Sequence, residues 1–335
     1  MALPPRDRDG TGVERNATRE RWATELAARA RAHWTPERTA ELACGKALQI
    51  LPADAAPLLR ALGILDHDAT LPPARAAKYF QINHMVALLG PGLRALRERH
   101  PVIRLVDAGC GRSYLTLLIA WCAREVWRQP LRVLGVDRNP ALIEASRRRC
   151  ALAGLDDVVR FEAAALDAVD VRAAWPRGFP GDAGEVHGVV ALHACDTASC
   201  DAIALGVELG AELIAVAPCC QAELARAWSA LADGEPTDGF AAIRGAPHLR
   251  RETAAHVTDA MRMLLLRAAG YDARAIEFVP AEHTRKNTLI RALRHTGADP
   301  DAAAAYAALC AATGGAGLAL AARLGITGAG QRTRT

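Results

Sequence analysis

Two glycines and two aspartates in the first half of the chain have the spacing of a nucleotide-cofactor site. Gly109 and Gly111 follow directly on an apolar run that ends at Asp107, and a stretch with helical periodicity comes after them. Glycines at such a turn let the backbone bend sharply and approach a ligand closely. The free N–H groups of the following helix point at the same place. Asp137 ends the next apolar run, where a carboxylate can accept hydrogen bonds from ribose hydroxyls. The spacing therefore predicts a site for a cofactor that carries a ribose.

The glycine spacing discriminates between two such cofactors. A dinucleotide fingerprint requires G-x-G-x-x-G, and Tyr114 occupies the third glycine position. The acidic Asp107 before the turn suits a cationic sulfonium better than a pyrophosphate. The stretch from Asp107 to Gly111 resembles the D-x-G-x-G first motif of class I S-adenosylmethionine-dependent methyltransferases, and the resemblance implies S-adenosyl-L-methionine as cofactor. A glycine turn in an unrelated α/β protein is the remaining alternative.

The elements that must position these residues alternate between strand and helix. Short apolar runs separated by helical periodicity predict strands at 102–106, 131–136, 158–161, 186–192, 212–217, 273–279 and 288–293. This alternation predicts an α/β fold with a doubly wound, mainly parallel, seven-stranded sheet, and the resemblance implies that it is of the Rossmann-like methyltransferase type. The last two strands, joined by a short polar loop, are expected to close the sheet as an antiparallel pair.

The chain divides into four expected regions. They are a disordered tail at 1–17, an N-terminal helical region at 18–98, a methyltransferase domain at 99–295, and C-terminal helices with a tail at 296–335. Proline- and glycine-rich composition predicts loops at about 172–185 and 233–248.

Composition limits the class of protein. The 335 residues carry a formal net charge of only +4, which is no global signature of nucleic-acid binding. No apolar run approaches the ~20 residues of a membrane span, and the polar N-terminus has no apolar signal core. Nine cysteines without a secretory signal predict free thiols in a reducing, cytoplasmic setting.

Ligands of such sheets bind outside the carboxyl ends of the strands, so the polar residues that follow each strand are the candidates for binding. The residues expected to bind the cofactor are Asp107, Gly109, Gly111, Ser113, Asp137, Arg138, Glu162, Ala163 and His193. The residues expected to contact the substrate are Lys78, Gln81, Cys220, Gln221, His283, Lys286 and Asn287. Lys78 and Gln81 precede the sheet on a helix that we expect to cover the cofactor.

The end of the fourth strand offers two groups for proton transfer. His193 or Asp196 could accept a proton from a hydroxyl nucleophile. The structural alternatives are a hydrogen-bonded histidine that closes the strand and, for Asp196, an N-cap of the helix beginning at Thr197. Both assignments stay open at this level.

Three thiols should meet at the ends of the fourth and fifth strands. Cys195 follows the fourth strand, and Cys219 and Cys220 follow the fifth. They are expected to be buried packing thiols, zinc ligands together with His193, a nucleophilic thiol or a redox pair. The zinc interpretation lacks a standard ligand spacing, and no metal is assigned.

Four segments together resemble one branch of the class I methyltransferases. They are K-Y-F-Q-I at 78–82, V-D-A-G-C-G-R-S-Y-L at 106–115, L-H-A-C-D-T-A at 192–198 and A-P-C-C-Q at 217–221. The branch contains ribose 2′-O-methyltransferases of the tRNA acceptor stem and related methyltransferase-like proteins, and cytosine-C5 RNA methyltransferases place cysteines at the same two strand ends. Where the family often has H-x-C-G and C-C-H or C-C-Y, this chain has Asp196 and Gln221. The resemblance implies RNA as substrate. The alternatives are a methyltransferase for a protein side chain or small metabolite, and a non-catalytic cofactor-binding scaffold.

Overall fold

The computed structural model describes residues 12–182, 184–192, 196–218, 221–232, 239–277, 288–295 and 297–326. Within these ranges seven strands form one sheet in the order β3-β2-β1-β4-β5-β7-β6. The strands are β1 (Ile103–Ala108), β2 (Leu131–Asp137), β3 (Val159–Ala163), β4 (Gly188–Ala191), β5 (Leu213–Val216), β6 (Tyr271–Glu277) and β7 (Thr288–Arg294). Strands β1 to β5 pair in parallel, and β7 runs antiparallel to β5 and β6. This confirms the mainly parallel sheet with a reversed closing strand.

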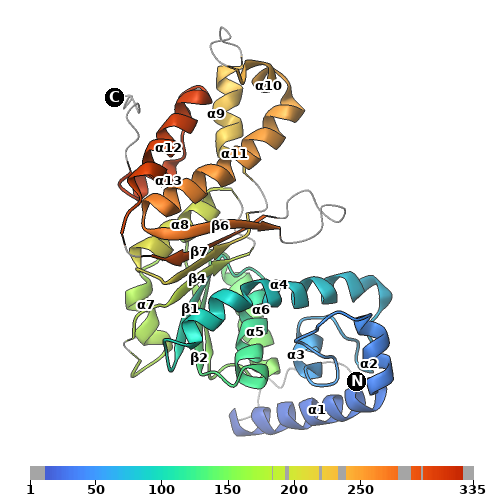
Figure 1. Ribbon diagram of the computed structural model, residues 1–335. Coiled ribbons are helices and arrows are strands. Elements are labelled where there is room, and N and C mark those ends of the chain that lie inside the picture. Colours follow the sequence, from blue (N-terminus) through green and yellow to red (C-terminus); the bar gives the residue numbers. More distant parts are fainter. Residues whose placement is uncertain are drawn as a thin grey trace.

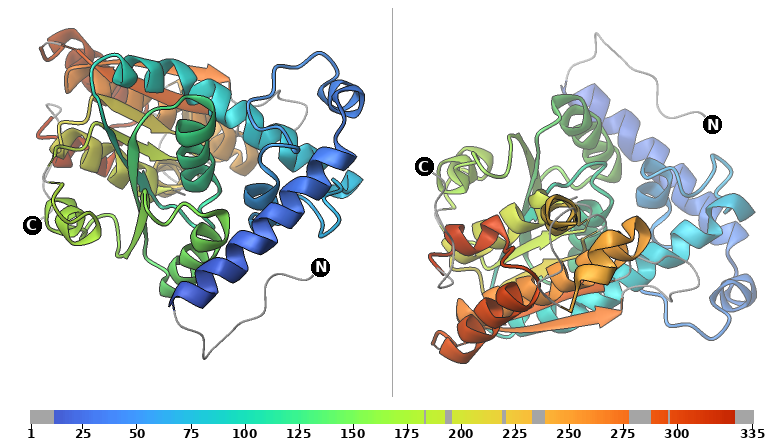
Figure 2. Two further views of the ribbon diagram at one scale, coloured as in Figure 1. Left: turned by 90° about the horizontal axis from the view of Figure 1, so that it is seen from below. Right: turned by 90° about the horizontal axis from the view of Figure 1, so that it is seen from above.

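Helices cover both faces of the sheet (Figure 1). One face carries the N-terminal helices and the two helices after β1 and β2: α1 (Gly12–His33), α2 (Pro36–Ala43), α3 (Ala56–Ala61), α4 (Pro73–Arg97), α5 (Tyr114–Trp121) with the π-helical turn η1 (Cys122–Val126), and α6 (Pro140–Ala153). The other face carries α7 (Val171–Gly178), α8 (Thr197–Glu208), α9 (Glu223–Leu231), α10 (Ala241–Gly245), α11 (Pro247–Ala268), α12 (Pro300–Ala312) and α13 (Ala319–Arg323). Figure 2 shows the two layers from either side.

The side chains of β1 alternate between the two hydrophobic cores, one on each face of the sheet. Ile103 and Leu105 belong to the core under α4, α5 and α6, whereas Val106 and Ala108 belong to the core on the opposite face. Because successive strand residues point to opposite faces, Asp107 lies on the α5 side of the sheet. Its position below α5 follows from the strand period alone.

Helix α4 fixes the N-terminal region through buried polar side chains. The Tyr79 hydroxyl donates to the Ile50 carbonyl at 2.6 Å. Asn83 Oδ1 accepts the backbone N–H groups of Gln49 and Ile50 at 3.1 and 2.9 Å. Part of the K-Y-F-Q-I segment and the asparagine that follows it therefore stabilise the fold rather than contact a ligand.

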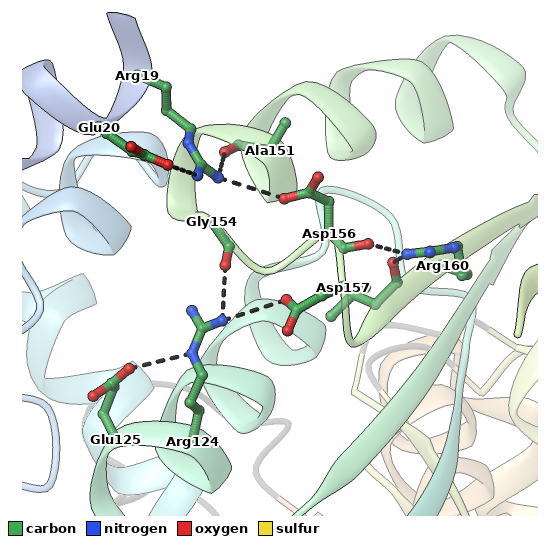
Figure 3. A network of polar contacts seen from close by, with 10 residues as sticks. Arg19, Glu20, Arg124, Glu125, Ala151, Gly154, Asp156, Asp157 and Arg160 are labelled. Atoms are coloured by element: carbon green, nitrogen blue, oxygen red, sulfur yellow. Dashed lines mark hydrogen bonds and ion pairs between the residues drawn. The ribbon is translucent and has the colours of Figure 1, made fainter. Parts of the chain in front are cut away.

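Helix α1 is joined to the turn between α6 and β3 (Figure 3). Arg19 donates to the Ala151 carbonyl at 3.2 Å and forms an ion pair with Asp156 at 3.6 Å. From the other side, Arg124 of η1 donates to the Gly154 carbonyl at 2.8 Å. These contacts fix the N-terminal helices against the sheet.

Helices α1, α7 and α10 differ from the expectation from sequence. Helix α10 (Ala241–Gly245) and the start of α11 at Pro247 lie within the predicted loop at 233–248. Helix α1 begins at Gly12, within the segment 1–17 that composition predicts to be disordered; residues 1–11 lie outside the described residues. The predicted loop at 172–185 contains the last two turns of α7, which the Asp170 carboxylate caps by accepting the Ala173 N–H at 3.0 Å. Pro176, which favours a loop by its residue type, lies within the last turn of α7. In the described ranges, no helix has the length and apolarity needed to cross a membrane.

Acidification should destabilise the fold through His187, which precedes β4. Its ring stacks on His100 at 3.6 Å, and its Nδ1 accepts the Arg104 N–H at 3.2 Å. Burial, with His100 and Arg104 nearby, lowers the pKa of His187 to about 4, although Glu212 and Asp182 act in the opposite direction. The folded state therefore resists protonation, and the stability that neutral His187 provides is complete above pH 6.5 and is lost between about pH 6.5 and 4.

Urea unfolding at several pH values checks this expectation. We expect the unfolding midpoint of the wild type to fall more steeply between pH 6.5 and 4 than that of His187→Gln. Parallel pH dependence of the two proteins would contradict it.

Candidate active site

The glycine turn after β1 is fixed to the neighbouring strand by its backbone. Gly109 and Gly111 have φ of +73° and +52°, which favours glycine at both positions. The N–H groups of Gly109 and Cys110 donate to the Val136 carbonyl at 2.8 and 2.9 Å. The turn is therefore positioned over the end of β2.

Asp137 lies beside this turn and joins it to α6. Its Oδ2 accepts the Gly111 N–H at 2.9 Å, and its Oδ1 accepts the Asn139 N–H at 2.9 Å. The Asn139 side chain caps α6 by accepting the N–H of Ala141 at 3.0 Å. Because each carboxylate oxygen has a further lone pair, the carboxylate can still accept two ribose hydroxyls.

Asp107 lies below the turn and is almost completely buried, with 1% of its surface exposed. The hydroxyl of Thr116 in α5 donates to its carboxylate. Burial raises the pKa of Asp107 to about 7; the Thr116 hydrogen bond acts against this shift, and the charge of Asp137 adds to it. No cation is paired with Asp107 among the described residues. A carboxyl group in this setting is suited to a cationic ligand, which would favour its charged form.

Ser113 occupies the N-cap position of α5, but its side chain does not cap the helix. Its hydroxyl is fully buried next to the Cys110 thiol, and within the described chain it makes no hydrogen bond of good geometry. The first N–H groups of α5 are consequently free of a side-chain acceptor. Free N–H groups at a helix N-terminus favour an anionic group.

The other residues expected at the cofactor lie around Asp137. Arg138 is exposed and follows it directly. Ala163 is the pairing partner of Asp137 in β3, and Glu162 next to it forms an ion pair with Arg177 at 3.1 Å. The structure thus brings the expected cofactor residues of β1, β2 and β3 to one edge of the sheet.

Gly135 in β2 contributes to this site although the sequence analysis did not select it. A Cβ at this position would lie 2.7 Å from the Phe161 ring and 3.1 Å from the Cys110 sulfur. The absence of a side chain lets the turn and β3 approach β2 closely. A glycine within an apolar strand is the signal that could have identified it.

Several expected residues of the acceptor side lie outside the described residues. They are His193, Cys195, Cys219, Cys220, His283, Lys286 and Asn287. Asp196 directly follows Cys195, and Gln221 directly follows Cys220. Both residues are described, and their contacts are given below.

Asp196 connects the loop after β4 with the helix after β5. Its Oδ1 accepts the N–H groups of Ala222 and Glu223 at 2.8 and 3.0 Å, and its Oδ2 forms an ion pair with Arg226 at 2.8 Å. It occupies the N-cap position of α8 but makes no side-chain bond there. The alternative that Asp196 caps the helix from Thr197 is therefore wrong, because the carboxylate caps α9 instead.

The backbone of Asp196 has a conformation that favours glycine. Its φ of +53° and ψ of −117° correspond to a turn position that glycine dominates. Burial alone would raise the pKa of Asp196, but the hydrogen bonds from Arg226, Ala222 and Glu223 hold it below the ordinary value. A carboxylate with both oxygens engaged and a low pKa is a poor general base, so the geometry favours a positioning role.

Substitutions at Asp196 separate the two roles. If Asp196 positions α9, Asp196→Ala lowers the free energy of unfolding by about 1–2 kcal/mol. Asp196→Gly should cost less, because glycine relieves the backbone strain. Asp196→Asn, which keeps one acceptor oxygen, should keep the pH–rate profile.

Denaturant unfolding and pH–rate profiles measure these effects. The matched control is Asp170→Ala, which removes the cap of α7 far from the site and should destabilise the fold with no specific change in turnover. Loss of the acidic limb of the profile in Asp196→Asn, where the rate rises as a catalytic base loses its proton, would show that Asp196 accepts the proton.

A buried network on α11 supports the same loops. Arg262, with 1% of its side chain exposed, pairs with Asp259 at 3.1 Å and donates to the Asp196 carbonyl at 2.9 Å. Asp259 in turn accepts Nε2 of Gln221 at 3.0 Å. Arg262 and Asp259 are not among the residues that the sequence predicts for the site. A charged pair three residues apart within an apolar stripe of α11 was the available signal.

A pocket of about 400 Å³ opens between α9 and α11, beside Pro218 after β5 and Thr288 at the start of β7. Arg226, Arg250 and Arg251 contribute positive charge to its lining. Two acidic residues, Glu252 and Asp259, also line the pocket, and Asp259 pairs with Arg262. Gln221 is a further lining residue.

The side chain of Gln221 is an unusual feature of this pocket. Gln221 has 8% of its surface exposed, and its Oε1 is buried without a hydrogen-bond partner among the described residues. A buried acceptor of this kind is stabilised when a ligand supplies a donor.

On the N-terminal side, the side chain of Lys78 in α4 contacts Tyr114, which is the first residue of α5. Its Nζ is 3.6 Å from the centroid of the Tyr114 ring. Gln81 is exposed one turn further along α4. The structure therefore brings Lys78 of α4 next to the first residue of α5, which follows the glycine turn.

Residues 77–227 match a family model described as a methyltransferase domain. Among curated proteins, none matches the chain. The solved structures that are similar include geranyl diphosphate methyltransferase in complex with GPP and sinefungin (18% identity, 78% of this chain and all of that chain, TM-score 0.39). Similar structures also include cofactor-bound Rv0187 from MTB (18% identity, 78% and 98%, TM-score 0.39) and Podospora anserina methyltransferase PaMTH1 (13% identity, 77% and 94%, TM-score 0.38).

Proposed function

We propose that this chain is an S-adenosylmethionine-dependent methyltransferase and that it transfers the methyl group to RNA; the match of residues 77–227 to a model of a methyltransferase domain supports the first part of the proposal. The cofactor supplies a methyl group already activated on a sulfonium. The residues of the chain have to bind and orient it, align the acceptor and exclude water. Asp137, the glycine turn and buried Asp107 suit the ribose and the positive charge of this cofactor.

The pocket between α9 and α11 carries the proposal for RNA. The cofactor residues follow β1, β2 and β3, and the pocket adjoins the end of β5. An acceptor held there would face the cofactor along one edge of the sheet. Its volume of about 400 Å³ lies in the range of pockets that hold small ligands or single groups of larger ones.

The charges of the pocket favour an acceptor that carries phosphate. Arg226 is paired with Asp196, and Arg250 donates to the Arg244 carbonyl at 2.7 Å. Arg251 is exposed and has no ion pair within the described chain. Arginine is well suited to phosphate oxygens, and the free Oε1 of Gln221 can accept a hydrogen bond from a base or a ribose hydroxyl. The resemblance to enzymes that methylate the tRNA acceptor stem supports the same substrate class.

Transfer of a labelled methyl group from the cofactor into separated RNA, protein and metabolite pools tests the proposal. We expect the label in RNA. Label in protein or in small metabolites would instead support the alternative methyltransferase, and a protein that binds the cofactor without transferring label to any pool would be a scaffold.

Substitution of pocket arginines tests the same proposal by a second route. Arg250→Gln/Arg251→Gln should weaken RNA binding and reduce the slope of log affinity against log salt by roughly one to two. The control, Arg21→Gln/Arg31→Gln, makes the same charge change on exposed positions of α1, which lies far from α9 and α11 (Figure 1). Equal effects of the two double variants would contradict a role of the pocket.

A further inference from the structure

The N-terminal helices cover the two helices whose starts line the cofactor site. Helix α3 contacts α5 and α6, and α4 contacts α5. The Tyr114 hydroxyl donates to the Leu62 carbonyl at the end of α3 at 3.0 Å. The first residue of α5 is therefore held between the glycine turn and the N-terminal region.

Lys78 brings a positive charge to this position. Its side chain is exposed, and its ammonium group lies 3.6 Å above the centre of the Tyr114 ring. No ion pair of Lys78 exists within the described part of the chain. A cation over an aromatic face gains only about 0.5–1 kcal/mol at an exposed site, so the contact orients the ammonium group without neutralising it.

The start of α5 has a second feature that points to an anion. The Ser113 hydroxyl is fully buried at the N-cap position, and none of the described residues gives it a well-formed hydrogen bond. The first N–H groups of the helix also have no side-chain acceptor. A helix N-terminus and a buried hydroxyl thus lie at the start of α5, and an ammonium group without an ion pair in the described chain lies over the ring of its first residue.

We propose that Lys78 binds the carboxylate of the methionine part of the cofactor, together with the start of α5. The N-terminal helical region then forms one wall of the cofactor site. The inference depends on the methyltransferase assignment but not on the nature of the acceptor.

The geometry selects Lys78 from the nearby cations. Arg138 follows Asp137 directly, on the ribose side of the site, and Arg112 lies within the turn. Of these three, Lys78 is the one whose charge is fixed against a residue of α5. A bound carboxylate would accept a charge-assisted hydrogen bond from the Lys78 ammonium group, which has no acidic partner among the described residues.

Two ligands that differ in the methionine part test the proposal with the full chain. S-adenosylhomocysteine carries the carboxylate, whereas 5′-methylthioadenosine lacks the whole amino-acid part. We expect Lys78→Met to weaken S-adenosylhomocysteine about tenfold to a hundredfold and to leave 5′-methylthioadenosine within about twofold of its wild-type affinity. Lys78→Arg should recover most of the loss.

Lys46→Met is the matched control. Lys46 also lies over an aromatic ring, at 4.9 Å from the centroid of Phe80 in α4, and its substitution should change neither affinity. Equal weakening of both ligands in Lys78→Met would show a structural effect and overturn the proposal, as would an unchanged affinity for S-adenosylhomocysteine. Failure of the wild type to bind either ligand would instead refute the cofactor assignment itself.

Discussion

Replacing Asp137 with alanine should weaken binding of S-adenosylhomocysteine by about a hundredfold or more. The carboxylate is expected to accept two ribose hydroxyls, and hydrogen bonds to a charged group contribute about 1.5–3 kcal/mol each. It also accepts the N–H groups of Gly111 and Asn139, so its removal loosens the glycine turn. Isothermal titration of the wild type and the variant measures the loss.

Two further variants complete this test. Asp137→Asn keeps one acceptor oxygen and should lose less affinity than the alanine variant. The control Asp272→Ala removes an exposed aspartate of β6 that pairs only with Arg274 among the described residues, and it should bind normally. An Asp137→Ala protein that is folded and binds within threefold of the wild type would contradict the assignment of Asp137 to the ribose.

Replacing Arg262 with methionine should lower the free energy of unfolding by about 3–5 kcal/mol, as breaking a buried ion pair by removing one partner does. The guanidinium group pairs with Asp259, donates to the Asp196 carbonyl and contacts the Cys200 sulfur at 3.4 Å. Its loss leaves a buried carboxylate with only Gln221 as a described partner. Denaturant unfolding measures the effect.

The pH dependence of the Arg262→Met variant provides an independent readout. Burial already raises the pKa of Asp259, and Arg262 opposes this rise. Without Arg262 the pKa should rise further, so the defect should be smallest at low pH and should grow as pH rises through the new pKa.

Two variants complete the test of Arg262. Arg262→Met/Asp259→Leu should be more stable than Arg262→Met, because it removes the unpaired carboxylate. The matched control Arg267→Met, on the same helix but exposed, should cost less than about 1 kcal/mol. An Arg262→Met protein as stable as the wild type would contradict the account of the network.

The parts of the fold set by local patterns could be predicted from the sequence. The apolar run, the two glycines and Asp137 define β1, the turn and the end of β2, and the structure joins them through the Gly111–Asp137 hydrogen bond. Asn139 followed by proline predicts the start of α6, and Gly154 with φ of +66° closes it. In each case the signal and the structural reason lie within a few residues of each other.

The parts that depend on contacts between distant segments could not be predicted. Asp196 reads locally as a cap of α8, yet its carboxylate reaches α9 because β4 and β5 are neighbours in the sheet. Arg262 reads as one of many arginines, and its burial becomes visible only when its side chain is seen to reach Cys200 of α8 and the Asp196 carbonyl. The role of Lys78 is a similar case, because Tyr114 lies 36 residues further along the chain.

A crystal structure of the full chain with S-adenosylhomocysteine would show whether Asp137 and the glycine turn bind this ligand. We expect the ribose hydroxyls at hydrogen-bonding distance from the Asp137 carboxylate and the homocysteine part next to the glycine turn. A ligand bound elsewhere, or a site that stays empty under saturating ligand with the turn rearranged to block it, would contradict this expectation.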